Sequence, residues 1–370
     1  MTNTLVSDVE PDEWFDPEAP EVTGSDAAPA AVKDQTPIII TERSGQGIAS
    51  DLVLPPDKVR LLNYAAELER NGGKTLPADK AFSARVWAQV SLPYKDPGTS
   101  LPVWSRKNGD VTLRVRPAIL TDKSGADTVA YPFGIMPRHI MTWMASEAVR
   151  THSRHLILGK SMNTFIEKLQ IETGGNTRRR LRDQMERVFG SQLSVEGLTR
   201  GEAGQGYGES KRFIQVTDST DLWFSDKGEI DTDHLWASKI TLSQPFYDSI
   251  IEAPLPVDMK ALKALGTKPF TFDIYVWVGY RLYSLQYPTR MAWADLQMQF
   301  GSQTKRLRDF RGQFADALGD IKILLPSLQY EIEQDYLLLY PGPTPIEQTS
   351  KRHTVKSNRT ISGAAAPVDS

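Results

Sequence analysis

The chain of 370 residues contains no cysteine, only five histidines and no long apolar run. Without cysteine, disulfides and cysteine-ligated zinc sites are excluded, which is typical of a cytoplasmic protein. No apolar stretch reaches the length of about 18 residues that a transmembrane helix needs. The acidic beginning of the chain also lacks the basic residues and apolar core of a secretory signal. We therefore expect a cytoplasmic protein without a membrane partner.

Side chains typical of enzyme centres are also scarce. His152 and His155 are three positions apart, but no further histidine or carboxylate is predicted near them to complete a metal site. Gly159-Lys160-Ser161 resembles the end of a phosphate-binding loop, which also requires a glycine five residues earlier, where Arg154 stands. Ser161 is instead expected to cap the next helix. We predict no enzymatic activity, no cofactor and no metal.

The net charge of −3 is distributed unevenly. Residues 1–40 carry nine acidic side chains and one lysine, a net charge of −8 that leaves +5 for the rest of the chain. Residues 1–50 are also rich in proline and alanine without apolar periodicity, which predicts a disordered acidic tail. Residues 346–370 are predicted to form a disordered basic tail. The mildly basic body between the tails is therefore the part suited to binding phosphates.

The body predicts an α+β fold with two modules of similar order. A leading helix over residues 56–69 and a linker fill residues 51–80. The first module spans residues 81–225. It is predicted to begin with strands at 82–92 and 111–115, followed by helices from about 137 and 162. A basic helix over 177–189 and a long hairpin that ends at 212–216 complete it. The second module spans residues 226–345, with a strand at 239–242, helices at 246–252, 257–265 and 270–285, a helix around Trp293 and Leu296, a basic helix over 304–318 and a hairpin over 328–340.

Helices, then a basic helix, then a hairpin is the order of a winged helix. Because this order occurs twice, we predict two winged-helix domains in tandem. The tetrapeptide Arg180-Leu181-Arg182-Asp183 of the first basic helix also recurs as Arg306-Leu307-Arg308-Asp309 in the second. This repetition indicates an internal duplication.

Helical spacing gives each basic helix one apolar and one charged face. The residues expected to point inward are Leu181, Met185 and Val188 in the first helix, and Leu307, Phe310, Phe314 and Leu318 in the second. Arginine holds guanine edges or phosphate oxygens with its planar fork, so the charged faces are predicted to bind DNA. Basic residues beside the glycine-rich hairpin tip would contact DNA as a wing. The candidate DNA-binding residues are Arg178, Arg179, Arg180, Arg182, Lys211, Arg212, Lys305, Arg306, Arg308 and Arg311.

A plainer interpretation stays open for these residues. The charged faces could be solvated surfaces stabilised by pairs such as Asp183 with Arg187. The basic residues of the hairpin could likewise be ordinary exposed strand charges. Tryptophans at positions 87, 143, 277 and 293 lie in apolar stretches and are expected to be core.

Several blocks between residues 82 and 341 resemble the RepA family of plasmid replication initiators. These blocks are Tyr131-Pro132-Phe133-Gly134-Ile135-Met136-Pro137-Arg138, Glu147-Ala148-Val149-Arg150-Thr151, Leu156-Ile157-Leu158-Gly159, Thr173-Gly174-Gly175, Arg180-Leu181-Arg182-Asp183-Gln184-Met185, Asp221-Leu222-Trp223-Phe224, the segment 257–265 and Phe272-Asp273-Ile274-Tyr275. The resemblance implies a protein of the bacterial cytoplasm that binds repeated sites, called iterons, in double-stranded plasmid origin DNA. It also implies opening of an AT-rich stretch, recruitment of a host helicase and initiator, copy-number control, and a homodimer in equilibrium with a DNA-binding monomer.

Three other functions remain as alternatives. A transcriptional repressor could use the same folds on a promoter, although a simple repressor more often dimerises one module over a palindrome. An enzyme acting on DNA would need clustered carboxylates or a phosphate loop, which the sequence does not show. In an interaction protein without affinity for DNA, the basic helices would only be solvated surfaces.

Overall fold

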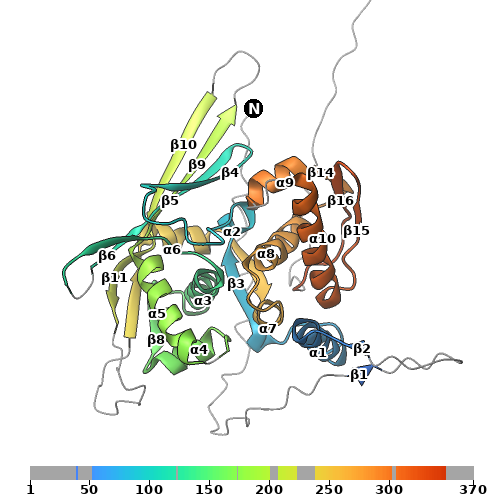
Figure 1. Cartoon of the computed structure of the whole chain (residues 1–370), viewed down its shortest axis with the longest axis horizontal. Coiled ribbons are helices and arrows are strands. Elements are labelled where there is room, and N and C mark those ends of the chain that lie inside the picture. The colour runs from blue at the N-terminus through green and yellow to red at the C-terminus, as the bar shows by residue number, and fades with distance from the viewer. Residues whose placement is uncertain are drawn as a thin grey trace, which may run out of the picture.

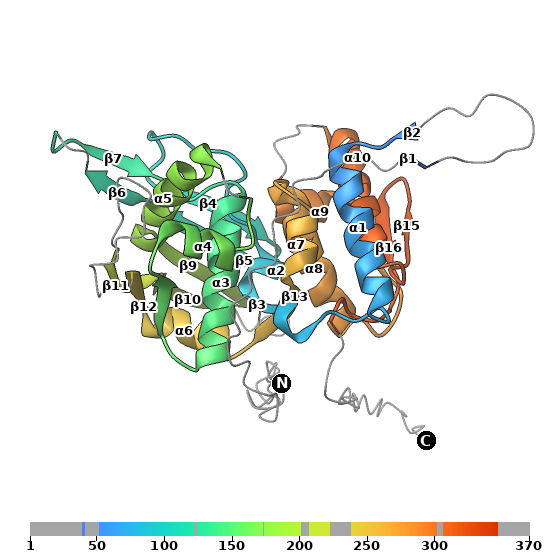
Figure 2. The same cartoon turned by 90° about the horizontal axis from the view of Figure 1, so that it is seen from below.

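The computed structural model describes residues 39–40, 52–121, 124–172, 174–200, 207–222, 238–301 and 306–346. The predicted tails lie outside these ranges, except for Ile346 and for strand β1 (Ile39–Ile40), which pairs with β2 (Leu52–Val53). The described residues form an α+β structure with two lobes, which lie side by side in Figure 2. Within these residues, no helix combines the length and the apolar character that crossing a membrane requires.

The first lobe is built around helix α3 (Ile135–Thr151), shown in green in Figure 1. The apolar face of α3 is buried, with Ile140, Met144 and Ala148 completely shielded from solvent. The shorter helices α4 (Met162–Lys168) and α6 (Gln244–Ile251) and the basic helix α5 (Gly175–Gly190) pack around it. Their apolar faces share one hydrophobic core with α3, as the helical spacing predicts.

Three sheets complete the first lobe. The strands are β4 (Trp104–Asn108), β5 (Val111–Arg116), β6 (Ala118–Thr121), β7 (Asp127–Ala130), β8 (His155–Gly159), β9 (Gln192–Arg200), β10 (Tyr207–Gln215), β11 (Thr217–Asp221) and β12 (Ser238–Leu242). One antiparallel sheet has the order β10-β9-β5-β4, another has the order β11-β12-β8, and β6 pairs with β7. The predicted long hairpin is present as β9 and β10, with Gln192 opposite Gln215.

The second lobe surrounds helix α8 (Pro269–Ser284), which is apolar on nearly all sides and buried. Helices α1 (Pro56–Arg70), α7 (Met259–Ala264), α9 (Trp293–Phe300) and α10 (Leu307–Leu324) contribute to its core. Strands β14 (Thr289–Ala292), β15 (Tyr330–Ile332) and β16 (Tyr336–Leu339) form an antiparallel sheet in which β16 is central. The rings of Trp277 and Trp293 contact Phe314 of α10 edge to face, which fixes α10 against this core.

The two lobes meet along a pair of strands and through Arg106, which is partly buried. Strand β3 (Lys80–Ala84) pairs with β13 (Pro254–Asp258), between the segments that build the first and second cores. Arg106 of β4 reaches the end of α9, where its guanidinium occupies the place that a side chain at Gly301 would take. Gly301 has a φ of +53°, which favours glycine. A cation at a helix C-terminus is stabilised by the helix dipole, so Arg106 links the first lobe's sheet to α9.

The cores do not follow the predicted domain boundaries. The boundary between residues 225 and 226 separates β11 from β12, yet these strands pair, and α6 belongs to the first core. Helix α1, predicted within a leading segment, packs against α7 and α10 in the second lobe. The reason is that apolar spacing identifies a helix, whereas its packing partner depends on contacts far away in the sequence.

Two predicted elements also need correction. The expected strand over residues 82–92 ends at Ala84, because its partner β13 begins at Pro254, and a short helix, α2 (Val86–Gln89), follows it. The expected helix over residues 257–265 begins only at Met259, since Val257 and Asp258 still pair in β13. Trp143, Trp277 and Trp293 are core residues as predicted, whereas Trp87 in α2 is only partly buried.

Candidate nucleic-acid interface

Helix α5 carries the first group of predicted DNA-binding residues. Leu181, Met185 and Val188 are completely buried, so the predicted inward face is confirmed. The helix follows α4, which Ser161 caps as expected by accepting a hydrogen bond from the Thr164 amide at 3.2 Å. The side chains of Arg178, Arg179 and Arg180 are exposed at the beginning of α5.

The hydrogen-bond partners of these arginines leave their charges unneutralised. Arg178 donates to the Asn163 amide oxygen at 2.8 Å, and Arg179 donates to the Asn176 amide oxygen at 3.0 Å. Cations at a helix N-terminus also oppose the helix dipole, which favours anions there by about 0.3–1 kcal/mol. Stability of α5 therefore does not explain three successive arginines at this end. A phosphate backbone docked on the N-terminus would be attracted by both the arginines and the dipole.

Further along α5, arginines form pairs within the protein. Arg182 is exposed and lies 3.4 Å from Glu186, an ion pair of little energetic weight at a surface. Arg187 is mostly buried and binds Asp183 at 2.9 Å and the Tyr131 carbonyl at 3.1 Å. The plainer interpretation, a helix with internal ion pairs, therefore applies to Arg187. It does not account for the three arginines at the start.

The hairpin β9–β10 does not bring its two candidate residues together. Adjacent residues of a strand point to opposite faces, so Lys211 and Arg212 project from different sides of β10. Arg212 lies 3.3 Å from Glu252, directly after α6. Lys211 is on the outer face of the sheet, opposite Glu196. Of the glycines predicted at the hairpin tip, Gly201, Gly204 and Gly206 lie outside the described residues, and Gly208 is part of β10, opposite Thr199.

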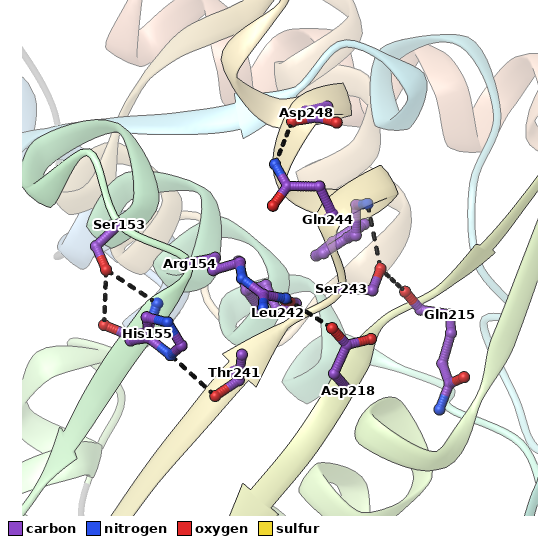
Figure 3. A network of polar contacts seen from close by, with 11 residues as sticks. Ser153, Arg154, His155, Gln215, Asp218, Thr241, Leu242, Ser243, Gln244 and Asp248 are labelled. Carbon is purple, nitrogen blue, oxygen red and sulfur yellow. Dashed lines mark hydrogen bonds and ion pairs between the residues drawn. The ribbon is translucent and has the colours of Figure 1, made fainter.

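The base of this hairpin is fixed by the polar network of Figure 3. Arg154 donates to Asp218 at 2.6 Å and to the Leu242 carbonyl at 3.1 Å, which connects β8 to β11 and β12. Ser243 donates its backbone N–H to the Val216 carbonyl at 3.2 Å and its hydroxyl to the Gln215 carbonyl. The network holds the junction of β10 and β11 in one position relative to β8 and β12. The hairpin therefore leaves the lobe from a fixed base.

Helix α10 carries the second group. Phe310, Phe314 and Leu318 are completely buried as predicted, whereas Leu307 is 42% exposed, so its expected inward position is wrong. Leu307 is the first residue of the helix, one turn before the part that faces the core. Lys305 lies outside the described residues.

The arginines of α10 are exposed to different degrees. Arg306 precedes the helix and is exposed, and the Arg308 side chain is 79% exposed, with Asp309 3.7 Å away. Arg311 is partly buried and donates to the Gln334 carbonyl at 3.0 Å, which ties α10 to the turn between β15 and β16. This turn contains Glu333 and Asp335. The start of α10 is thus cationic, whereas the neighbouring hairpin turn is acidic.

The repeated tetrapeptide does not occupy equivalent positions. Arg180 lies within α5 and Leu181 is buried, whereas Arg306 precedes α10 and Leu307 is exposed. The four-residue identity therefore provides no support for an internal duplication. The similarity of the lobes lies instead in the order of their elements, which is helix, strand, two helices and hairpin in α3–β8–α4–α5–β9–β10 and in α8–β14–α9–α10–β15–β16.

The structure adds two cationic residues that the sequence did not single out. Arg114 and Arg116 are exposed on β5, next to β9 in the same sheet. Alternation along β5 predicts their outward direction, but only the pairing of β5 with β9 places them beside the hairpin. Among the described residues, no three His, Asp or Glu side chains gather in a way that could hold a metal ion.

The chain was compared with known proteins. No curated protein matches it. Two solved structures of domains 2 and 3 of RctB resemble it. One is a selenomethionine derivative with 12% sequence identity and a TM-score of 0.44. The match covers 69% of this chain and 97% of the RctB chain. The other has 11% sequence identity and a TM-score of 0.39, and the match covers 70% of this chain and 97% of the RctB chain.

A family model described as plasmid encoded RepA protein, RepA_C, matches residues 131–294. The matched segment begins at the Tyr131-Pro132-Phe133-Gly134 motif and includes α3, α4, α5, the hairpin β9–β10 and α8. The resemblance to RepA-type plasmid replication initiators is thereby confirmed over residues 131–294, which match the RepA_C model.

Proposed function

We propose that this protein initiates plasmid replication by binding repeated sites in double-stranded origin DNA, without enzymatic chemistry of its own. The observation that carries the proposal is the cluster of Arg178, Arg179 and Arg180 at the N-terminus of α5, inside the segment that matches RepA_C. Arg178 and Arg179 bond to neutral amide oxygens, which leaves their positive charges available to phosphates. A helix N-terminus with exposed arginines is suited to entering the major groove between two phosphate backbones.

The proposal includes two winged helices. In the second lobe, the hairpin β15–β16 follows the helices α8, α9 and α10, and β16 also pairs with β14, which lies between α8 and α9. This order and pairing support a winged helix in which α10 is the recognition helix and Arg306 and Arg308 meet DNA. In the first lobe, α5 and the hairpin β9–β10 take the corresponding roles. Two different reading helices in one chain suit an extended, asymmetric site.

The acidic turn of the second hairpin refines this proposal. Glu333 and Asp335 would be repelled by phosphates, so the hairpin β15–β16 would stay away from the DNA backbone. Readout by the second lobe would then depend on the start of α10 alone. The first lobe, with Arg178, Arg179 and Arg180 at the start of α5, would supply more of the phosphate contacts.

The RepA resemblance extends the proposal beyond binding. It includes opening of an AT-rich stretch, recruitment of a host helicase and initiator, copy-number control, and a homodimer that dissociates into the DNA-binding monomer. None of these steps requires a nucleotide or a metal in this protein.

The test is a salt-titrated binding assay with DNA that flanks the protein's own gene and random duplex as competitor. We expect tight binding to one set of direct repeats, at least about 10³-fold stronger than binding to random duplex. Binding to a single promoter palindrome would instead identify a repressor. Equal, weak binding to all sequences would contradict the proposed function.

A further inference from the structure

The outer face of the sheet β4–β5–β9–β10 takes no part in the duplex contacts of α5 and α10. Leu113, Val115, Leu193 and Ile214 point from this sheet into the first core. Because side chains alternate along a strand, their neighbours point outward. Phe213 is one of these neighbours and is 68% exposed. A single exposed apolar side chain is ordinary on a protein surface, so the surroundings of Phe213 decide its meaning.

The strand register places cations along β10 and across the sheet from Phe213. Phe213 is opposite Ser194, and Ser194 is opposite Arg114, so the ring and the arginine share one row across three strands. Lys211 lies two residues from Phe213 on the same face of β10. Arg116 lies two residues from Arg114 on β5. An aromatic ring is therefore placed between cations on an open sheet.

A hollow adjoins the ring on this face. It has a volume of about 240 Å³ and is lined by Phe213, Arg116, Gln192, Ser194 and Gln215. Gln192 and Gln215 are directly opposite on neighbouring strands, and Arg116 is opposite Gln192 on the other side. Each glutamine side chain can both donate and accept hydrogen bonds. The hollow thus combines a stacking surface, a phosphate-binding fork and groups that can pair with the edge of a base.

We propose that this face binds single-stranded DNA, with a base stacked on Phe213 and the backbone held by Arg114 and Arg116. In a duplex, the flat faces of the bases are covered by neighbouring bases, so an exposed aromatic ring cannot stack on them. An unpaired base offers its face to an aromatic side chain, and cations beside the ring follow the backbone. The inference rests on the proposed function, because opening of the origin supplies the single strand.

The charge on this face disfavours a second copy of the chain as its occupant. Glu196 is an acidic residue there, and Arg114 binds it at 2.9 Å. The face also carries Arg116, Lys211 and Lys107, so positive charge exceeds negative charge. Two copies packed face to face would bring like charges together, whereas a polyanion is attracted. The charge therefore matches a nucleic-acid strand.

The experiment measures binding of the full-length protein to a fluorescent oligothymidine of 20 nucleotides and, separately, to the duplex repeats beside its gene. Phe213→Ala is expected to weaken oligothymidine binding about 5- to 150-fold, the range that one lost stacking contact gives. Phe213→Trp should retain binding, and Phe213→Leu should lose it although it stays apolar. Duplex binding should change less than twofold in all three variants. Ile119→Ala is the matched control, since Ile119 on β6 is also 68% exposed.

The outcomes separate this inference from the proposed function. Equal binding of oligothymidine by the wild type and Phe213→Ala would overturn the single-strand site, even if duplex repeats are bound tightly. A shift of Phe213→Ala from dimer to monomer in sedimentation, without loss of oligothymidine binding, would assign the face to a second copy instead. Binding of oligothymidine that depends on Phe213, without binding of any duplex, would support the site and refute the proposed duplex readout.

Discussion

Arg138 of α3 binds Asp273 of α8 through two parallel hydrogen bonds of 2.7 Å each, and this pair joins the two lobes. Both side chains are buried, with 4% and 7% of their surface exposed. The guanidinium also donates to the carbonyls of Leu92 and Gly134. The bonds to Leu92 and Gly134 hold the guanidinium within the first lobe, so its bonds to Asp273 tie α3 of the first lobe to α8 of the second.

Replacing Asp273 with alanine should destabilise the protein by about 3–5 kcal/mol, because Arg138 would remain charged and buried without its partner. The measurement is urea unfolding followed by tryptophan fluorescence. Glu147→Ala removes an exposed ion pair of the same helix with Arg150 and should cost less than about 1 kcal/mol. A similar decrease in the free energy of unfolding for both variants would show that the buried pair stabilises the protein no more than a surface pair does.

Acid should destabilise the protein through His139. Burial, with a further contribution from Arg138, lowers the pKa of His139 to about 4, compared with 6.5 in an unfolded chain. The unfolded state therefore takes up a proton at lower pH values than 6.5 while the folded state does not. Above pH 6.5, neutral His139 causes no such loss. As the pH falls from 6.5 toward 4, the free energy of unfolding decreases by up to about 3 kcal/mol, because only the unfolded state gains the proton.

Urea midpoints measured between pH 7 and pH 4.5 test this expectation. His139→Leu should show a smaller decrease in stability over that interval than the wild type, since carboxylates titrate alike in both proteins. His155, which is exposed and accepts or donates a hydrogen bond with Thr241, serves as the control in a His155→Asn variant. A decrease in His139→Leu equal to that of the wild type would mean that His139 is not the responsible group.

Two glycines should respond in opposite ways to alanine. At Gly301 a methyl group would coincide with the Arg106 guanidinium and take a φ of +53°, so Gly301→Ala should cost about 1–3 kcal/mol. Gly312 lies within α10 with open space around it, so Gly312→Ala should stabilise the helix by about 0.5–1 kcal/mol. Thermal unfolding monitored by circular dichroism measures both changes. Stabilisation by Gly301→Ala would contradict the position assigned to Arg106.

Arg308→Ala should weaken binding to the specific duplex by about 1–3 kcal/mol if this side chain reads a base. A loss of similar or smaller size is expected for Arg182→Ala, since Arg182 already lies beside Glu186. Fluorescence anisotropy with the gene-flanking repeats measures both, and Lys263→Ala, an exposed lysine on α7, is the control. Unchanged specific affinity in Arg308→Ala would remove α10 from the readout.

The sequence predicted most helices of the two lobes, because apolar residues at helical spacing indicate a buried face whichever element packs against it. Leu181, Met185 and Val188 are an example. Spacing could not show that α1 belongs to the second lobe or β12 to the first, since both placements depend on partners far along the chain. For the candidate site, spacing gave the arginines of α5. It could not give the row of Phe213, Ser194 and Arg114, which exists only once the strand register is known.

The placement of α1 has a consequence for synthesis on the ribosome. Tyr64 of α1 donates a hydrogen bond to Asp258, which is translated 194 residues later. At about 5–20 residues per second, α1 waits on the order of 10–40 s for this partner. In that time residues 84–250, which build the first core, are complete and can fold. The apolar side of α1, with Leu61 and Tyr64, meanwhile remains accessible to chaperones, and the second lobe forms last, once α7, α8 and α10 are available to pack against α1.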